Sequence, residues 1–301
     1  MEYHNPVLLK ETVDGLNIKP DGIYVDVTFG GGGHSKEILD RLGPNGRLFA
    51  FDQDEDALEN ALPDERFELI NENFRFIKRF LRFHNVRQVD GILADLGVSS
   101  HQFDEASRGF SIRAEAALDM RMNQHGDLTA EKVVNDYEQD DLLRVLRTYG
   151  EISNAWKLVN MIIAERRNKR IKTTGQFLEI VEKCAPKHRE HKYFAQVFQA
   201  IRIEVNDEMG ALEAFLKQSE KVLKPGGRLV VMSYHSLEDR LVKNFMKRGS
   251  LSGEIEKDFF GNVLKPFTEI VRHPIVADAE ELERNSRARS AKLRIAERNG
   301  E

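Results

Sequence analysis

The stretch IYVDVTFGGGGHS, residues 23–35, decides the fold of this chain. Its β-branched and aromatic residues favour a strand that ends in Asp26, and four consecutive glycines follow before His34 and Ser35 can open a helix. Glycine tolerates positive φ and lets a ligand approach the backbone closely. The N-terminus of a helix adds unpaired N–H groups and a positive dipole end. The stretch therefore predicts a turn that binds a nucleotide-type ligand, with a plain tight turn as the alternative.

Composition sets the broad class of the protein. The chain has 301 residues with 41% hydrophobic and 8% aromatic content, enough for a packed core in one large or two modest domains. Its formal net charge of −5 argues against nucleic-acid binding through bulk charge alone. The single cysteine, Cys184, excludes an intramolecular disulfide and a Cys-based zinc or iron–sulfur site. No signal peptide or long apolar run is readable, which predicts a cytoplasmic protein without a membrane segment.

Strand and helix patterns alternate on both sides of the glycine turn. Strands are expected at 23–26, 47–52, 67–70, 89–97, 228–234, 268–271 and 291–295, and helices at 33–42, 55–62, 74–84 and 207–223. Such alternation predicts an α/β fold with a parallel sheet. Three of the strands end in an acid, Asp26, Asp52 and Asp95, and ligands of α/β sheets bind beyond the carboxyl ends of the strands. These three acids predict one shared pocket.

The alternation breaks in the middle of the chain. Between about residues 104 and 205 the apolar residues recur at helical spacing, as at Ile152, Trp156, Val159 and Ile163. We therefore expect a helical domain, residues 104–205, inserted into an α/β domain formed by residues 1–103 and 206–301.

The residues around the glycines distinguish between nucleotide-type cofactors. A P-loop needs Lys-Ser or Lys-Thr after its last glycine, and the sequence His34-Ser35-Lys36 argues against ATP or GTP. Asp52 at the end of the second strand suits the ribose hydroxyls of NAD and S-adenosylmethionine alike. Asp26, placed before the glycines, can receive the cationic amino-acid group that S-adenosylmethionine has and NAD lacks. The sequence thus favours S-adenosylmethionine, with an NAD-dependent Rossmann oxidoreductase as the alternative.

Seven segments carry a more specific signal: VDVTFGGGGHS (25–35), DGILADLGVSS (90–100), RGFS (108–111), LDMRM (118–122), FQAIRIEVN (198–206), SYHSLEDR (233–240) and RARSAKLR (287–294). In this order they resemble the bacterial 16S rRNA cytosine-N4 methyltransferase family, of the RsmH/MraW type. The resemblance covers nearly the whole chain. The sequence departs from the usual family pattern at His101, at Ser286 and over residues 191–196.

The resemblance implies a Rossmann-like class I methyltransferase sheet and methylation of the exocyclic amine (N4) of a cytidine in the decoding region of 16S rRNA within the small ribosomal subunit. It leaves open a non-catalytic ribosome-assembly factor, and it leaves open the oligomeric state, a homodimer included. By motif position it implies S-adenosylmethionine contacts at Gly32, Gly33, His34, Asp52, Phe74, Asp95 and Gln102.

The residues also bear on which cytosine atom is methylated. Methylation at carbon 5 normally needs a cysteine nucleophile, and Cys184 is far in sequence from the strand ends. This favours the exocyclic amine, whose proton must be accepted during or after transfer. Asp95 is the first candidate acceptor and His235 the second. We predict no metal site.

Basic segments are the candidates for RNA contact. Residues 284–298 hold six basic side chains against the single acid Glu297, and residues 166–172 and 187–192 of the expected insert are also basic. Each segment is either a solvated face or a surface that meets the RNA backbone.

Overall fold

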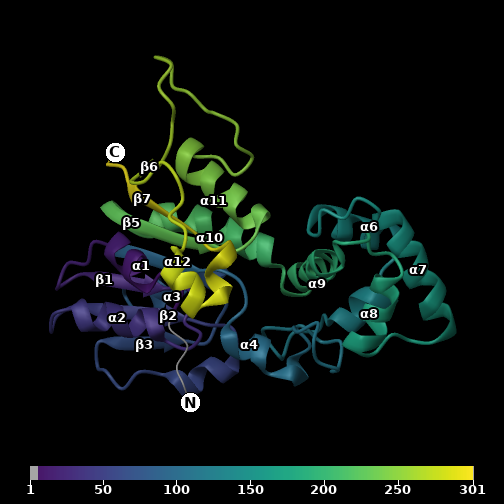
Figure 1. Ribbon diagram of the computed structural model, residues 1–301. Helices are drawn as coiled ribbons and strands as arrows, with labels where there is room; N and C mark the ends of the chain where they lie inside the picture. Colours follow the sequence, from purple (N-terminus) through teal and green to yellow (C-terminus); the bar gives the residue numbers. More distant parts are fainter. Residues whose placement is uncertain (1–5, 301) are drawn as a thin grey trace. The chain divides into compact units, whose positions relative to one another are not determined.

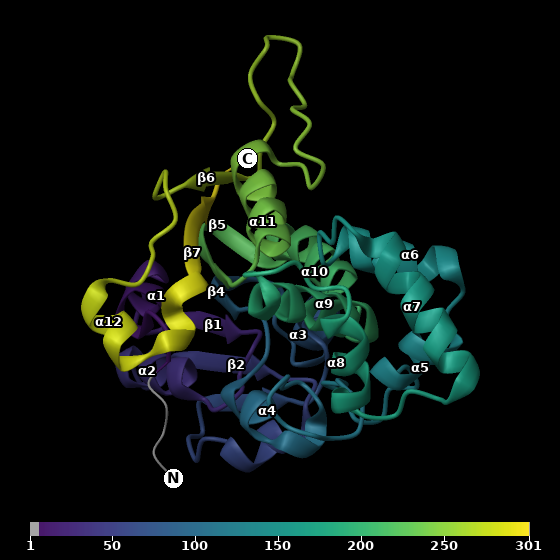
Figure 2. The same cartoon turned by 45° about the vertical axis from the view of Figure 1, so that its right-hand side comes forward.

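A computed structural model describes residues 6–300 (Figures 1 and 2). The chain divides into two compact units. The sheet unit comprises Met1–Gly97 and Met209–Glu301, and the helical unit comprises Val98–Glu208. The boundaries therefore fall at 97/98 and 208/209, against 103/104 and 205/206 expected from the sequence.

The sheet unit contains a seven-stranded sheet in the order β3-β2-β1-β4-β5-β7-β6. Its strands are β1 (Ile23–Asp26), β2 (Arg47–Phe51), β3 (Phe67–Ile70), β4 (Val89–Asp95), β5 (Leu223–Ser233), β6 (Phe267–Glu269) and β7 (Lys292–Arg298). β7 runs antiparallel to both of its neighbours, and the pairs among β1 to β5 are parallel. This order with a reversed β7 is that of a class I methyltransferase sheet, so the predicted fold class is confirmed.

Side chains alternate between two cores, one on each face of the sheet, because successive strand residues point in opposite directions. Val25 belongs to one core and Tyr24 to the other. The core around Val25 is covered by α3 (Ile77–Phe83), α10 (Glu208–Val222) and α11 (Ser236–Arg248). The core around Tyr24 is covered by α1 (Leu9–Gly15) and α2 (Gly33–Arg41). Both faces are thus buried, as a parallel sheet requires.

Register sets the depth of the three strand-end acids. Asp26 of β1 is level with Ala50 of β2 and Leu93 of β4. Asp52 and Asp95 therefore lie two residues beyond the level of Asp26, at the rim of the sheet. As a result the carboxyl group of Asp26 is buried, whereas those of Asp52 and Asp95 are partly accessible.

Two helices expected from the sequence, at 55–62 and 74–84, are shorter or begin with a tighter turn in the structure. Residues 55–60 and 74–76 form 3-10 turns, η1 (Glu55–Asn60) and η2 (Phe74–Phe76), and α3 starts only at Ile77. The side chains of Asp54 and Asn73 each accept a hydrogen bond from the backbone N–H two residues later, which favours a tight turn over an α-helical start. β5 also begins earlier than expected, because Leu223 already pairs with Val89 before the register shifts.

The helical unit packs helices around its own core. They are α4 (Ser100–Asp104), α5 (Ala130–Asp136), α6 (Gln139–Thr148), α7 (Ala155–Asn168), α8 (Thr174–Glu182) and α9 (Glu190–Asn206), with the short turn η3 (Ala106–Arg108). The face predicted for α7 was wrong at Trp156, which is 53% exposed. The helix begins at Ala155, and its buried face is formed by Ala155, Leu158, Val159 and Ile162.

The remaining segments of the sheet unit are α12 (Ala279–Arg284), the turn η4 (Ser286–Ser290) and an irregular segment, residues 250–266, that extends beyond α11 in both views (Figures 1 and 2). Within residues 6–300, every helix is too short or too polar to cross a membrane.

Candidate functional site at the carboxyl ends of the strands

The glycine turn joins β1 to α2 and has the backbone that the sequence predicted. Gly30 and Gly32 have φ values of 51° and 75°, and Gly32 is the N-cap of α2. Side-chain-bearing residues are strained at such angles. The N–H of Gly30 donates to Oδ2 of Asp52 at 2.8 Å, and the side-chain amide of Asn60 donates to the carbonyl of Gly30 at 3.2 Å. The turn is therefore fixed from β2 and η1.

Asp26 lies beneath this turn and faces inward. Its Oδ2 accepts from the hydroxyl of Ser35 at 2.8 Å, and its Oδ1 accepts from the N–H of Thr28 at 3.1 Å. Burial raises the pKa of Asp26 to about 6, and the carboxyl group is 1% exposed. The expectation that Asp26 receives a cationic ligand group was based on its position alone. In the structure this carboxyl group braces the turn against α2.

Asp52 sits at the rim, half-buried, directly after β2. Its two carboxylate oxygens accept from the backbone N–H groups of Gly30 and Asp54 at 2.8 and 2.9 Å. Each carboxylate oxygen has a second lone pair, so the group can still accept from two neighbouring hydroxyls. Burial raises the pKa of Asp52 to about 6, against the lowering effect of these two bonds.

Phe74 follows β3 at the start of η2 and is partly buried. Its ring centroid lies 5.5 Å from that of Phe215, with the two ring planes at 74°. An edge contact of this kind anchors the ring without stacking over its face. Phe74 is thus held as a flat apolar surface at the same end of the sheet.

Asp95 ends β4 and is contacted from two sides. The hydroxyl of Tyr234 donates to its Oδ1 at 2.8 Å, and Nδ1 of His34 lies 3.8 Å from its Oδ2. Its backbone N–H donates to the hydroxyl of Thr28 at 2.7 Å. The side chain is 23% exposed. Burial raises the pKa of Asp95 to about 7, with the Tyr234 bond acting in the opposite direction and the charges of Asp26 and Glu238 adding to the rise.

His34 presents an acceptor to Asp95. Its Nε2 lies 3.2 Å from the carbonyl oxygen of Val7, and because a carbonyl only accepts, this nitrogen carries the proton. Burial lowers the pKa of His34 to about 4, so the ring is neutral at pH 7 and Nδ1 keeps its lone pair. Two acceptors, Nδ1 of His34 and Oδ2 of Asp95, therefore face each other without a hydrogen bond between them.

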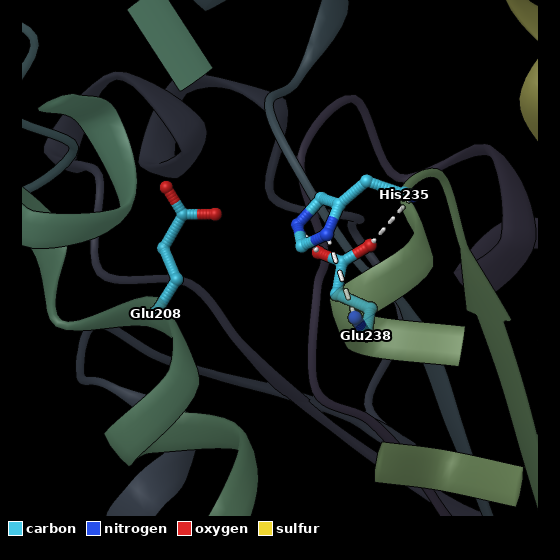
Figure 3. Close-up of side chains that lie close together, drawn as sticks. All are labelled: Glu208, His235 and Glu238. Atoms are coloured by element: carbon cyan, nitrogen blue, oxygen red, sulfur yellow. Dashed lines mark hydrogen bonds and ion pairs between the residues drawn. The ribbon is translucent and has the colours of Figure 1, made fainter. Parts of the chain in front are cut away.

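His235 and Glu238 form the start of α11 (Figure 3). His235 is the N-cap, and its Nδ1 accepts from the N–H of Glu238 at 3.4 Å. In return, Oε2 of Glu238 accepts from the N–H of Tyr234 at 2.9 Å and from that of His235 at 3.4 Å. Nε2 of His235 lies 3.1 Å from Oε1 of Glu238 but without hydrogen-bond geometry. Glu208, also drawn in Figure 3, ends the helical unit and pairs with Arg202 at 2.8 Å.

Residues 1–299 match the model of the MraW methylase family. The chain belongs to the MraW methylase family.

Relatives of this chain include the Ribosomal RNA small subunit methyltransferase H of Flavobacterium johnsoniae, 66% identical over 99% of this chain and 98% of that protein. The protein of the same name from Bacteroides thetaiotaomicron is 57% identical over 99% of this chain and 98% of its own. Among solved structures, an rRNA methylase from Streptococcus thermophilus is 13% identical, with a TM-score of 0.44 over 100% of this chain and 99% of that one. The family confirms the predicted enzyme class, a methyltransferase that uses S-adenosylmethionine.

The residues at the strand ends have the chemistry to hold S-adenosylmethionine. The two carboxylate oxygens of Asp52 could accept from vicinal ribose hydroxyls, and the apolar ring of Phe74 could lie against an adenine. The facing acceptors of His34 and Asp95 are an incomplete pair, which an N–H donor between them would satisfy. These acceptors on the rim of the sheet, together with the ring of Phe74, would therefore suit a nucleoside.

Most residues singled out from the sequence lie at or shortly after the carboxyl ends of strands β1 to β5 in the sheet unit: Gly32, Gly33, His34, Asp52, Phe74, Asp95 and His235. Gln102 belongs to the helical unit, where its side-chain oxygen accepts from the N–H of Ser99 in a capping box. Sequence reasoning missed Tyr234 and Glu238. Both stand in the quoted motif SYHSLEDR, and the acid three residues after a cap position was the available signal.

Proposed function

We propose that this protein transfers a methyl group from S-adenosylmethionine to the exocyclic amine (N4) of a cytidine in the decoding region of 16S rRNA. The observation that supports this chemistry is Asp95, a partly exposed carboxyl group at a strand end with a pKa near 7. The relatives' shared name, ribosomal RNA small subunit methyltransferase, supports the substrate. We place the reaction on the small subunit, in the cytoplasm.

The reaction needs an acceptor for one amine proton. S-adenosylmethionine supplies an electrophilic methyl group when bound. The amine lone pair of cytosine is delocalised into the ring, and a carboxylate that accepts an N–H hydrogen bond favours its localisation on nitrogen. As N4 forms its bond to the methyl carbon and the sulfur–carbon bond breaks, Asp95 accepts the proton that N4 loses. A base with a pKa near the working pH is suited to this step.

His235 is the weaker candidate acceptor on geometry. Its Nδ1 lone pair caps α11, so the neutral ring carries its proton on Nε2. A ring in that state has no second lone pair for an amine proton. We therefore assign proton acceptance to Asp95 and helix capping to His235.

Cys184 supports the choice of the exocyclic amine over carbon 5. It lies in the core of the helical unit and is 3% exposed. Burial raises the pKa of its thiol, which keeps the sulfur protonated and weakly nucleophilic.

The RNA is proposed to meet exposed basic side chains on both units. Arg287 and Arg289 in η4 are exposed, whereas Arg294 in β7 is buried and paired with Asp239 at 2.7 Å. Neutralising Arg287 and Arg289 should lower methylation without changing the affinity for S-adenosylmethionine. In the helical unit, which we propose recognises RNA, residues 187–192 are exposed. No step of the reaction requires a second copy of the chain.

The decisive experiment is mass spectrometry of nucleosides from small-subunit rRNA of cells with and without this protein. We expect N4-methylated cytidine to disappear without it and to return with the wild-type gene. Unchanged N4-methylcytidine would contradict the proposal. Equilibrium titration with S-adenosylmethionine and with NAD separates it from the oxidoreductase alternative. Restoration of subunit assembly by Asp95→Asn without methylation would indicate an assembly factor instead.

A further inference from the structure

Tyr234 connects the proposed proton acceptor to the start of α11. It follows the last residue of β5, and its hydroxyl reaches across to β4 to donate to Oδ1 of Asp95 at 2.8 Å. Burial, followed by the neighbouring charge of Asp95, raises the pKa of Tyr234 well above its ordinary value. The phenol therefore stays protonated and acts only as a donor toward Asp95 at any working pH.

We propose that Tyr234 is a positioning residue for methyl transfer: its hydroxyl occupies Oδ1 of Asp95, so that Oδ2 is the oxygen left to accept the proton of the cytidine amine. The inference rests on the proposed function. It assigns different tasks to the two carboxylate oxygens, which the strand-end position of Asp95 alone does not distinguish.

Glu238 fixes the tyrosine from the other side. Its carboxylate is buried and accepts from the backbone N–H groups of Tyr234 and His235, at 2.9 and 3.4 Å. These bonds hold the backbone of Tyr234 where β5 ends and α11 begins. The phenol can then turn only about its own side-chain bonds, which keeps its hydroxyl within reach of Asp95.

The groups around Asp95 determine what loss of the hydroxyl should do. Asp26 and Glu238 place negative charge nearby, and His34 is neutral at pH 7. The Tyr234 bond is the largest effect that favours the ionised form of Asp95. Without this bond the carboxyl group should hold its proton to a higher pH, and Oδ1 should compete with Oδ2 for the amine.

The test is Tyr234→Phe, which removes one oxygen and keeps the ring. We expect the acid limb of the single-turnover rate on unmethylated small subunits to move up by about one pH unit, because a hydrogen bond to a carboxylate contributes roughly that much. At pH 7 the rate should fall about fivefold, because the ionised share of Asp95 falls from about a half to about a tenth, whereas the affinity for S-adenosylmethionine should stay within about twofold. The matched control is Tyr24→Phe, which removes a buried hydroxyl that accepts from the N–H of Lys19.

A second readout does not depend on activity. Carbon-13 NMR titration of the carboxyl group of Asp95 in the free protein should show a higher pKa in Tyr234→Phe and an unchanged one in Tyr24→Phe. An unshifted acid limb together with an unshifted carboxyl titration would overturn the inference, even if the rate fell equally at all pH values. A wild-type protein that does not methylate N4 would instead contradict the proposed function, and the titration would still decide whether Tyr234 controls Asp95.

Discussion

The strand-end residues of the sheet unit and the Arg170 cluster of the helical unit differ in how their charged groups are stabilised. In the sheet unit, burial raises the pKa of Asp52 to about 6 and of Asp95 to about 7, and lowers that of His34 to about 4. In the helical unit the Arg170 guanidinium lowers the pKa of Asp136, the opposite direction for a carboxyl group. Groups whose charge is disfavoured by burial are suited to proton transfer, and groups whose charge is favoured by a partner are suited to holding a surface together.

The same contrast divides the basic segments of the helical unit. Arg166 donates to the carbonyls of Val134 and Tyr137, and Arg170 pairs with Glu131 and Asp136. Residues 187–192, in contrast, are all exposed. Arg166 and Arg170 are therefore engaged within the unit, whereas Arg167, Lys169 and Lys172 of the same segment are exposed, as residues 187–192 are.

Asp95→Asn should have the largest effect, because it removes the proposed proton acceptor and changes the shape of the site little. We expect the single-turnover rate at saturating S-adenosylmethionine to fall about 10³-fold, within the usual range for general base catalysis. A rate within tenfold of wild type would show that another group accepts the proton. It would also show that the raised pKa of Asp95 does not mark a catalytic role.

Asp52→Ala should act on cofactor binding and leave the transfer step nearly unchanged. Two hydrogen bonds from ribose hydroxyls to a carboxylate are lost, so the Kd for S-adenosylmethionine should rise about 30-fold. Isothermal titration calorimetry measures this change, and saturating kinetics should show a rate within a few-fold of wild type. Asp64→Ala is the control, since Asp64 pairs with Arg66 at 2.6 Å. Equal effects of the two variants would refute the ribose assignment.

Asp95→Asn should also stabilise the fold in a pH-dependent way. The folded pKa of about 7 lies above the ordinary value of 3.8, so the folded state binds the proton more tightly than the unfolded state. The stability that the protonated Asp95 contributes is present below pH 3.8 and is lost as the pH rises through 7. Asparagine does not titrate, so the variant does not lose stability in this way. The gain in unfolding free energy should be about 3 kcal/mol larger at pH 8 than at pH 5, as measured by urea unfolding. A gain independent of pH would contradict the sign of the shift.

Neutralising the exposed segment should weaken RNA binding alone. We expect the triple change Lys187→Ala, Arg189→Ala and Lys192→Ala to lower the affinity for the small subunit about tenfold and to reduce its salt dependence. Arg170→Ala is the matched control: it should lower the unfolding free energy by about 0.5 kcal/mol, as partly exposed pairs do, with unchanged RNA affinity. Binding at several salt concentrations measures both. If Arg170→Ala weakened RNA binding and the triple change did not, the RNA-binding segment would be residues 166–172 instead of 187–192.

The sequence predicted the sheet and its rim well, because β-branched runs that end in an acid leave little choice of strand position. It could not predict the depth of each acid. Asp26, Asp52 and Asp95 look equivalent as strand ends, but pairing of Asp26 with Ala50 and Leu93 puts it one pleat deeper than the other two. Depth depends on the register between strands that are far apart in sequence.

The sequence also could not predict which groups pair with its basic and tyrosine side chains. From the sequence, Arg166 and Arg170 were predicted to belong to a basic surface segment. In the structure they bind acids and carbonyls of α5 and of the segment that follows it, which are far from them in sequence. Tyr234 was likewise predicted only as the last residue of a strand. Its hydrogen bond to Asp95 forms only because β5 lies beside β4. Such roles require the tertiary structure.

The position of the helical unit within the chain affects how the protein is made. β4 pairs with β5, Leu93 with Val230, although the whole helical unit is synthesised between them. At about 5–20 residues per second this interval is on the order of ten seconds. During it β4 has β1 on one side and an open edge on the other, which is a known hazard for aggregation. Slow codons placed after residue 97, or a ribosome-associated chaperone that binds the chain at that stage, should therefore change the yield of folded protein. The same change near the C-terminus should have a smaller effect.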